Sequence, residues 1–194
     1  MINPEYLIDY SDWFDEGGYC QVYPIKDKKD LVFKEFRNKK KAQESYRYHK
    51  KLAKFDLAPK IYSKICKLEF APEDDLYQPE PSDWGYVTEL AKTHEANTKI
   101  SITDIQSLVE EIYSKTGLKF WDCHWYNVGL VDRGQKKKVV CIDTGKESFD
   151  GNANAWANPD PGPKCSYCEK YECKCDDGDT GYGFGGVLEN DDLK

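Results

Sequence analysis

The amino-acid composition changes at Ser148, and this change limits how much of the chain can form a hydrophobic core. Residues 148–194 are rich in Gly, Asn, Pro, Asp and Cys and show no apolar pattern typical of a helix or strand. A chain of 194 residues can form one sizeable core, or a smaller core with an appendage. The sequence therefore predicts a folded domain over residues 1–147 and a tail over residues 148–194.

Apolar periodicity predicts a mixed α+β fold for the first 147 residues, without the repeated strand–helix–strand order of a doubly wound sheet. Gly17 and Gly18 mark a turn between strands, and the Pro- and acid-rich residues 71–83 predict a surface loop. The expected strands lie within 17–36 and at 60–62, 84–91, 128–131 and 139–142, and the expected helices lie at 39–55 and between Thr103 and Gly117.

Each expected helix has a predicted apolar face. In the second helix, Thr103 and Gln106 have the spacing of a capping box, and Gly117 is a typical helix terminator. The predicted face of the first helix carries Glu44, Tyr48, Leu52 and Phe55, and that of the second carries Ile105, Leu108, Val109, Ile112 and Tyr113.

The net charge of −7 is unevenly distributed along the chain. Residues 26–60 contain 13 Lys or Arg against 5 Asp or Glu, whereas the segment from Cys173 onward is acidic. A basic stretch can bind phosphate or nucleic acid, but the overall acidity opposes this, so we expect a solvated helix face and no nucleic-acid partner. No leader-like segment and no membrane-length apolar run is visible, so we expect a cytoplasmic protein without membrane contact.

The eight cysteines form two groups. Cys20, Cys66, Cys123 and Cys141 are scattered in apolar contexts and are expected to be buried thiols. Four thiolates within eleven residues can wrap one tetrahedral Zn²⁺, and in a reducing compartment this interpretation is favoured over disulfides. A tail with reactive thiols is the alternative. The cluster consists of Cys165, Cys168, Cys173 and Cys175.

Two charged residues occur where the pattern is apolar. Lys34 lies inside the strand segment LVFKEF, and Glu44 lies on the predicted apolar face of the following helix. A charge removed from water needs a partner, so the sequence predicts a Lys34–Glu44 pair. The alternative is that both are unrelated surface residues at the edges of their elements.

Three further polar residues have the types that phosphoryl transfer needs. Asp122 and Asn127 occur in FWDCHWYN, and Asp143 ends the strand segment VVCID. A carboxylate can orient or deprotonate an acceptor hydroxyl, and an amide oxygen with a second carboxylate can hold Mg²⁺ against phosphates. Taken singly, Asp143 could belong to a plain turn and Asp122 could order a loop.

The order of these motifs resembles the protein-kinase family. EGGYCQVY, with Gly17, Gly18 and Val22, resembles the glycine-rich phosphate loop, VFKEF the lysine strand, WDCHWYN the catalytic loop and IDTG the magnesium segment. His124, two residues after Asp122, and the segment LAPKIY resemble the small-molecule kinase branch, which includes aminoglycoside phosphotransferases and choline kinases. The resemblance covers about residues 12–147.

The resemblance implies a minimal bilobal kinase-like domain that binds ATP and Mg²⁺, with an N-lobe over about 1–91 and a reduced C-lobe over about 92–147. Gly17, Gly18, Val22 and Lys34 would contact the nucleotide, with Glu44 positioning Lys34. Asp122 would be the catalytic base, and Asn127 and Asp143 would bind Mg²⁺. The acceptor would be a hydroxyl group on a protein or a small molecule.

The sequence also departs from the family pattern. Asp15 and Cys20 stand where two glycines of the phosphate loop would fall, and Phe120 and Trp121 precede Asp122 in place of His and Arg. Just 49 residues follow Gly145, so a protein partner could replace the missing part of the C-lobe. These departures favour a pseudokinase that binds a protein as the alternative function. A third possibility is a nucleic-acid binder that uses the basic helix at 39–55 and the zinc knuckle formed by the cysteine cluster at 165–175. So compact a chain suggests a virus, with the host cytoplasm as location.

Overall fold

The computed structural model describes residues 1–9, 15–16, 20–72, 80–93 and 100–149, with Asp15 and Glu16 described by their backbone alone. All of these residues belong to one unit, Met1–Pro161. Their elements form an α+β fold, as the sequence predicts. Gly17, Gly18 and the four clustered cysteines lie outside the described residues, so the predictions made for them stay predictions.

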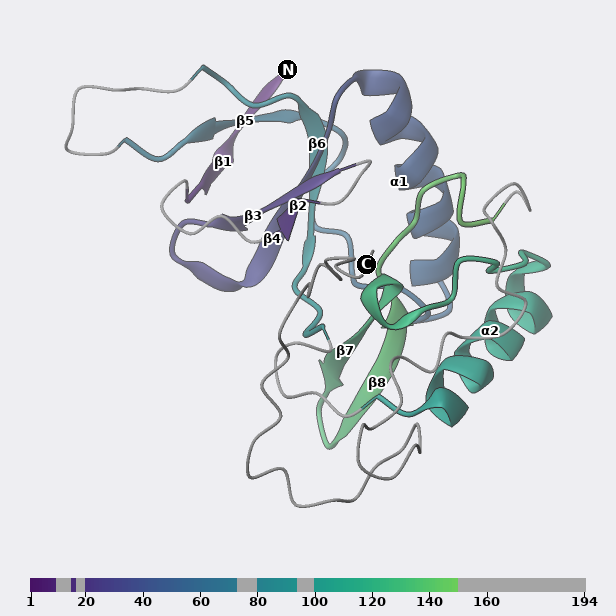
Figure 1. Cartoon of the computed structure of the whole chain (residues 1–194). Coiled ribbons are helices and arrows are strands. Elements are labelled where there is room, and N and C mark those ends of the chain that lie inside the picture. Colours follow the sequence, from purple (N-terminus) through teal and green to yellow (C-terminus); the bar gives the residue numbers. More distant parts are fainter. Residues whose placement is uncertain (10–14, 17–19, 73–79, 94–99, 150–194) are drawn as a thin grey trace, which may run out of the picture. The chain divides into compact units, whose positions relative to one another are not determined.

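The larger sheet has six strands in the order β5-β1-β3-β4-β6, and β2 pairs with β3 beside this path (Figure 1). The β1–β5 pair is parallel, whereas the other pairs in this sheet are antiparallel. The strands are β1 Ile2–Ile8, β2 Asp15–Glu16, β3 Gln21–Ile25, β4 Lys28–Phe36, β5 Lys67–Phe70 and β6 Trp84–Glu89.

The predicted strands are present except the one at 60–62, and three further strands and one turn are not apparent from the sequence. β1, β2 and β5 were not predicted, and the strand expected at 60–62 is wrong, since the structure has an isolated bridge at Ile61 there. The β3–β4 hairpin turns at Lys26 and Asp27, where Asp27 has φ 60°. Asp tolerates this left-handed conformation better than most residues, which makes it suitable for a tight turn.

Helix α1, Lys39–Ala53, begins at Asn38, whose side chain accepts a hydrogen bond from the amide of Lys41. Its buried face differs from the predicted one. Glu44 and Tyr48 are half-buried and Phe55 is exposed, so of the four predicted residues only Leu52 is fully buried. The buried residues are Ala42, Ser45, His49 and Leu52. Three of these four side chains are small or polar, so apolar periodicity alone does not identify this face.

Helix α2, Ile102–Thr116, begins two residues earlier than predicted and has a different capping box. The Ser101 side chain accepts from the amide of Asp104, and the Asp104 carboxylate accepts from the amide of Ser101. Thr103 and Gln106 do not form the predicted box, since Ser101 already occupies the cap position. Gly117 ends the helix with φ 69°, as predicted. No helix among the described residues is long and apolar enough to cross a membrane.

A second sheet consists of the predicted hairpin, β7 Val128–Arg133 and β8 Lys136–Cys141, which follows the short 3-10 helix η2 Trp125–Asn127. The hairpin packs with α2 and the end of α1 around a core that includes Leu52, Ile112 and Cys141 of β8 (Figure 1). Phe149 stacks on Phe120 in this core, so the packed region extends two residues past the predicted boundary at 147.

Arg133, at the end of β7, forms ion pairs with Glu89 at the end of β6 and with Asp56 in the segment after α1. Its guanidinium donates to both carboxylate oxygens of Glu89 at 2.7 and 3.0 Å and to Asp56 Oδ1 at 2.6 Å. The side chains of Arg133 and Glu89 are 15% and 16% exposed. A bidentate arginine–carboxylate contact of this kind is stronger than an exposed ion pair. It joins the end of β6 to the β7–β8 hairpin.

We expect Arg133→Ala to lower the free energy of unfolding by about 2–4 kcal/mol, because it leaves a poorly exposed Glu89 without its partner. Arg133→Lys should fall between the two proteins, since it keeps the charge and loses the planar fork. Urea unfolding measures both, with the exposed Lys137→Ala as a control expected within about 0.5 kcal/mol of wild type. Equal stability of wild type and Arg133→Ala would contradict this role.

Candidate functional site at the end of the second hairpin

Lys34 is buried at the centre of the six-stranded sheet. It lies opposite Val22 of β3 and Tyr86 of β6, so the three side chains share one face of the sheet. Its side chain is 7% exposed, and Nζ donates to the carbonyl oxygen of Ile142 at 2.7 Å. The other two ammonium hydrogens have no partner among the described residues. A buried ammonium group with two free donors is suited to bind an anion.

The charged form of Lys34 is maintained by its surroundings. Burial by itself disfavours the charge, but Cys20, Tyr86 and the Asp143 carboxylate outweigh this effect and raise the pKa of Lys34. Lys34 is therefore a buried cation close to Asp143.

The predicted Lys34–Glu44 pair is not formed. Glu44 lies 4.0 Å from Lys41 Nζ, and Lys41 donates a much shorter bond of 2.5 Å to Glu147. The reason is the rotation of α1, which turns Ser45 and His49 toward β6 and leaves Glu44 at the margin. The structure thus links Glu44 to the segment after Asp143 and not to the strand lysine.

Asp122, His124 and Asn127 form a compact cluster immediately before β7. Asn127 Nδ2 lies 2.9 Å from both Asp122 O and Asp122 Oδ2, and His124 Nε2 lies 3.3 Å from Asp122 Oδ1. Both oxygens that Nδ2 approaches can only accept, so they fix the orientation of the amide and turn Asn127 Oδ1 away from Asp122. Both oxygens of the Asp122 carboxylate are thereby held in place.

His124 lies beside both other members of this cluster. Its Nε2 is 2.9 Å from Asn127 Nδ2 and 3.3 Å from Asp122 Oδ1. His124 Nδ1 is buried without a hydrogen-bond partner within the described part of the chain. The imidazole therefore packs against Asp122 and Asn127 and restricts the positions of both side chains.

Asp143 follows β8 and is held beside Asn127. The Ile142 amide donates to Asn127 O at 2.9 Å, and the Asp143 amide approaches the same oxygen at 3.4 Å. Asp143 Oδ1 accepts from the Gly145 amide at 2.9 Å, and Oδ2 accepts from Ser148 Oγ at 2.8 Å. A Cβ atom at Gly145 would lie 3.2 Å from Asp143 Oδ1, so the glycine permits this close approach.

Asn127 and Asp143 supply oxygen donors that fit a magnesium ion shared with phosphates. Asn127 Oδ1 has no hydrogen-bond partner among the described residues, and each Asp143 oxygen keeps a free lone pair. Within the same residues, no group of three or more His, Cys, Asp or Glu side chains could hold a metal ion. Mg²⁺ usually has one or two protein carboxylates, with phosphates and water as its other ligands. The pair could therefore supply part of the coordination sphere of such an ion and would leave its other positions to phosphates or water.

A buried polar network that the sequence did not predict lies beside this site. His49 Nε2 is 2.8 Å from the carbonyl of Pro59, which can only accept, so Nε2 carries the hydrogen. His49 Nδ1 must then accept from the Tyr86 hydroxyl at 3.1 Å. Ser45 Oγ lies 2.9 Å from both the Tyr86 hydroxyl and Thr144 Oγ1. The network joins α1 and β6 to Thr144, the residue after Asp143.

The structure thus brings together most of the predicted site residues that it describes. Lys34 contacts the residue before Asp143, Asn127 contacts Asp122 directly and lies beside Asp143, and Glu44 stands apart. No protein-family model matches this sequence, and the comparison with curated proteins finds no similar one. We therefore infer the chemistry of the site from the positions of these residues and from the order of the motifs in the sequence.

His49 should make the stability of the protein depend on pH. Burial, with a smaller contribution from the Lys34 charge, lowers the pKa of His49 to about 3. The unfolded chain takes up a proton on this residue below about pH 6.5, while the folded protein stays neutral, so stability is complete above that pH and is lost as the pH falls toward 3. The expected slope is about 1.4 kcal/mol per pH unit, or about 2 kcal/mol between pH 6.5 and 5.

Urea unfolding of wild type and His49→Gln at pH 7, 6 and 5 measures this dependence. The variant has no titrating group at this position, so its stability should fall less steeply with acid, while the carboxylates contribute equally to both proteins. Parallel pH profiles would show that His49 is already free to protonate in the folded state.

Proposed function

We propose that this chain is a minimal protein-kinase-like phosphotransferase that uses ATP and Mg²⁺. The observation that carries the proposal is the 2.7 Å hydrogen bond from Lys34 to the carbonyl of Ile142. Although the two residues are 108 positions apart in the sequence, this bond holds a buried cation next to the segment of Asp143. The order of the elements supports it too. A lysine strand, a helix, a hairpin preceded by Asp122 and Asn127, and a closing Asp143-Thr144-Gly145 follow in the order of the kinase motifs.

Each polar group then has a role that its contacts support. Lys34 binds phosphate oxygens through its two free donors, and Val22, opposite it on β3, covers the nucleotide from the same face of the sheet. Asn127 Oδ1 and Asp143 hold the metal ion, which would neutralise charge on the phosphates during transfer. Asp122 accepts the proton of the acceptor hydroxyl while His124 and Asn127 hold its carboxylate.

The roles proposed for Gly17 and Gly18 at the phosphates, and for a structural Zn²⁺ on the four clustered cysteines, concern residues beyond those described. They remain part of the proposal on the strength of the sequence alone. The acceptor is a hydroxyl group on a protein or small molecule, with the cytoplasm as the proposed location.

A binding module without turnover is the second candidate, and one observation favours it. Glu44 is 4.0 Å from Lys41, which itself pairs with Glu147, so no carboxylate on α1 positions Lys34 in this structure. The lysine has the Ile142 carbonyl as its partner instead. In this alternative the nucleotide would be a structural ligand, and a protein partner would use the surface of the reduced second lobe.

Nucleotide binding can be tested by thermal unfolding with Mg-ATP at about 100 times its dissociation constant. The bound form should gain about 2.7 kcal/mol, which for a domain of this size raises Tm by about 5–10 °C. Asp143→Asn should lose most of the magnesium-dependent part, whereas Asp132→Asn, on the exposed β7–β8 hairpin, should keep it. Because the described residues form no metal cage of their own, Mg²⁺ alone should produce no shift. Equal shifts in both variants would remove Asp143 from the site.

Turnover separates the two candidate functions. Asp122→Asn keeps the shape of the side chain but cannot accept a proton, so the rate of ADP release from ATP should fall about 10²–10⁴-fold while the Mg-ATP stabilisation persists. A coupled ADP assay with excess Mg-ATP measures this rate. A wild-type protein that binds Mg-ATP without forming ADP or phosphoprotein would favour the binding module.

A further inference from the structure

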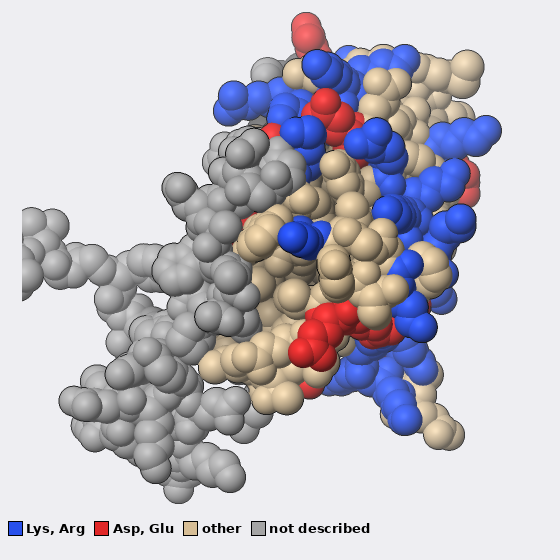
Figure 2. All heavy atoms as spheres, turned by 90° about the vertical axis from the view of Figure 1, so that its right-hand side faces the viewer, with Lys and Arg blue, Asp and Glu red and all other residues tan. Residues whose placement is uncertain are grey.

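The solvent face of α1 carries a continuous row of cations. With 100° between successive residues, six basic side chains of the helix and its C-terminal residue fall within an arc of about 120°, opposite the buried face. Gln43 lies in the same arc, and no acidic residue does. All six basic side chains are exposed: Lys39, Lys40, Arg47, Lys50, Lys51 and Lys54. Figure 2 shows the side of the molecule where basic side chains line the upper and right-hand margins, with few acidic ones between them.

The row is not neutralised by the protein. None of its six members forms an ion pair within the part of the chain that the structure describes. Lys39 lies over the Trp84 ring at 4.4 Å and Arg47 over the Tyr48 ring at 5.2 Å, contacts that leave the charge in place. The row is about 22 Å long, which follows from 15 helical residues at 1.5 Å each.

Folding alone does not favour this arrangement. Arg47 and Lys51, and Lys50 and Lys54, are like charges at i,i+4, which destabilise a helix. The first turn of α1 has Lys39 and Lys40 and no acidic residue, opposite to what the helix dipole favours, whereas Lys50 and Lys51 in the last turn agree with the dipole. The part of the row that opposes helix stability is therefore the first turn and the like-charge pairs. A chain that keeps these charges against helix stability gains if a bound polyanion compensates for them.

The overall acidity of the protein does not oppose binding at this face. Residues 1–149 contain 24 Lys or Arg and 25 Asp or Glu, so their net charge is −1. Residues 150–194 contain 4 basic and 10 acidic residues and account for the other six negative charges. The expectation of no nucleic-acid partner, which came from the net charge of the whole chain, therefore does not apply to the folded region.

We propose that the exposed face of α1, from Lys39 to Lys54, binds the phosphate backbone of double-stranded nucleic acid without reading its sequence. Membrane-surface helices insert an apolar face, but the buried face of α1 packs into the protein core. Protein interfaces are depleted of Lys and depend on aromatic anchors, which this arc lacks. A partner whose surface is a regular row of phosphates matches a face that offers charge alone.

The test measures fluorescence anisotropy of a labelled 20-base-pair DNA duplex with the full-length protein between 20 and 300 mM NaCl. Binding should weaken linearly on a log–log plot, with about 0.9 lost from the slope for each phosphate contact removed. The variant Lys50→Gln/Lys51→Gln/Lys54→Gln should therefore reduce the slope by about 2.7 and weaken binding at least about tenfold at 50 mM NaCl. Its Tm should stay close to that of wild type, because the removal of like-charge contacts opposes the loss of favourable charges at the C-terminal end of the helix.

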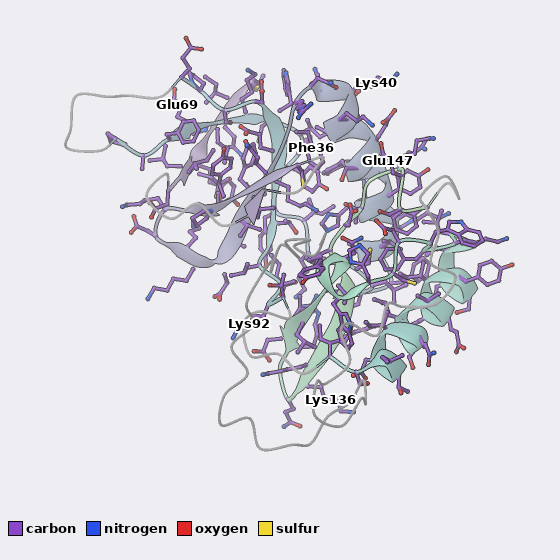
Figure 3. All side chains as sticks on the ribbon, viewed as in Figure 1. Phe36, Lys40, Glu69, Lys92, Lys136 and Glu147 are labelled. Atoms are coloured by element: carbon purple, nitrogen blue, oxygen red, sulfur yellow. The ribbon has the colours of Figure 1, made fainter. Side chains whose placement is uncertain are left out.

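A control variant matches the change in net charge. Lys29→Gln/Lys136→Gln/Lys137→Gln removes three exposed lysines from the two hairpins, and Figure 3 shows Lys136 far from Lys40 at the start of α1. This control and Asp143→Asn should bind the duplex like wild type, which separates this face from the proposed nucleotide site. Equal losses in the two triple variants, no duplex binding by wild type at 50 mM NaCl, or binding only to vesicles with 20% phosphatidylserine would each overturn the proposal.

Discussion

The arrangement of the site depends on the buried ammonium group of Lys34, because a charge removed from water must keep polar partners. Its bond to the carbonyl of Ile142 fixes the backbone on one side of Asp143. The same charge helps to keep His49 neutral, and a neutral His49 directs the hydrogen bonds that lead through Tyr86 to Thr144. A single cation thus constrains the residues on both sides of Asp143, one directly and one through the buried network.

The sequence predicted the parts of the fold that have a local signal. The β7–β8 hairpin, α1 and the end of α2 at Gly117 all follow from periodicity and turn residues. β1 and β5 were missed because their parallel pairing joins distant segments, and Pro4 within β1 argues locally against a strand. The buried face of α1 was misjudged for a related reason. It includes Ser45 and His49, whose burial depends on hydrogen bonds to other segments and not on hydrophobicity.

Prediction of the site was limited in the same way. Asp122, Asn127 and Asp143 could be found because they are close in sequence to strong strand and helix signals. The partner of Lys34 could not, since it is a backbone carbonyl, and every residue has one. Glu44 seemed the natural partner because carboxylates are the acceptors that a sequence makes visible. The rotation of α1 about its axis, which the hydrogen bonds of Ser45 and His49 to Tyr86 fix, places Glu44 away from Lys34. That rotation depends on packing between distant segments and cannot be seen in the sequence.

Helix α1 therefore has two different electrostatic environments on its opposite faces. Its buried face holds neutral polar groups near the Lys34 charge at low dielectric, where hydrogen-bond geometry is strict and salt has little effect. Its exposed face holds cations in water, where attraction is long-ranged, independent of sequence and strongly reduced by salt. A ligand of the first environment must fit a defined position beside Asp143, whereas a ligand of the second needs only a row of negative charges. The two environments share one helix but face opposite sides, so substitutions on the exposed face can change its charge while the register of Ser45 and His49 against β6 stays intact.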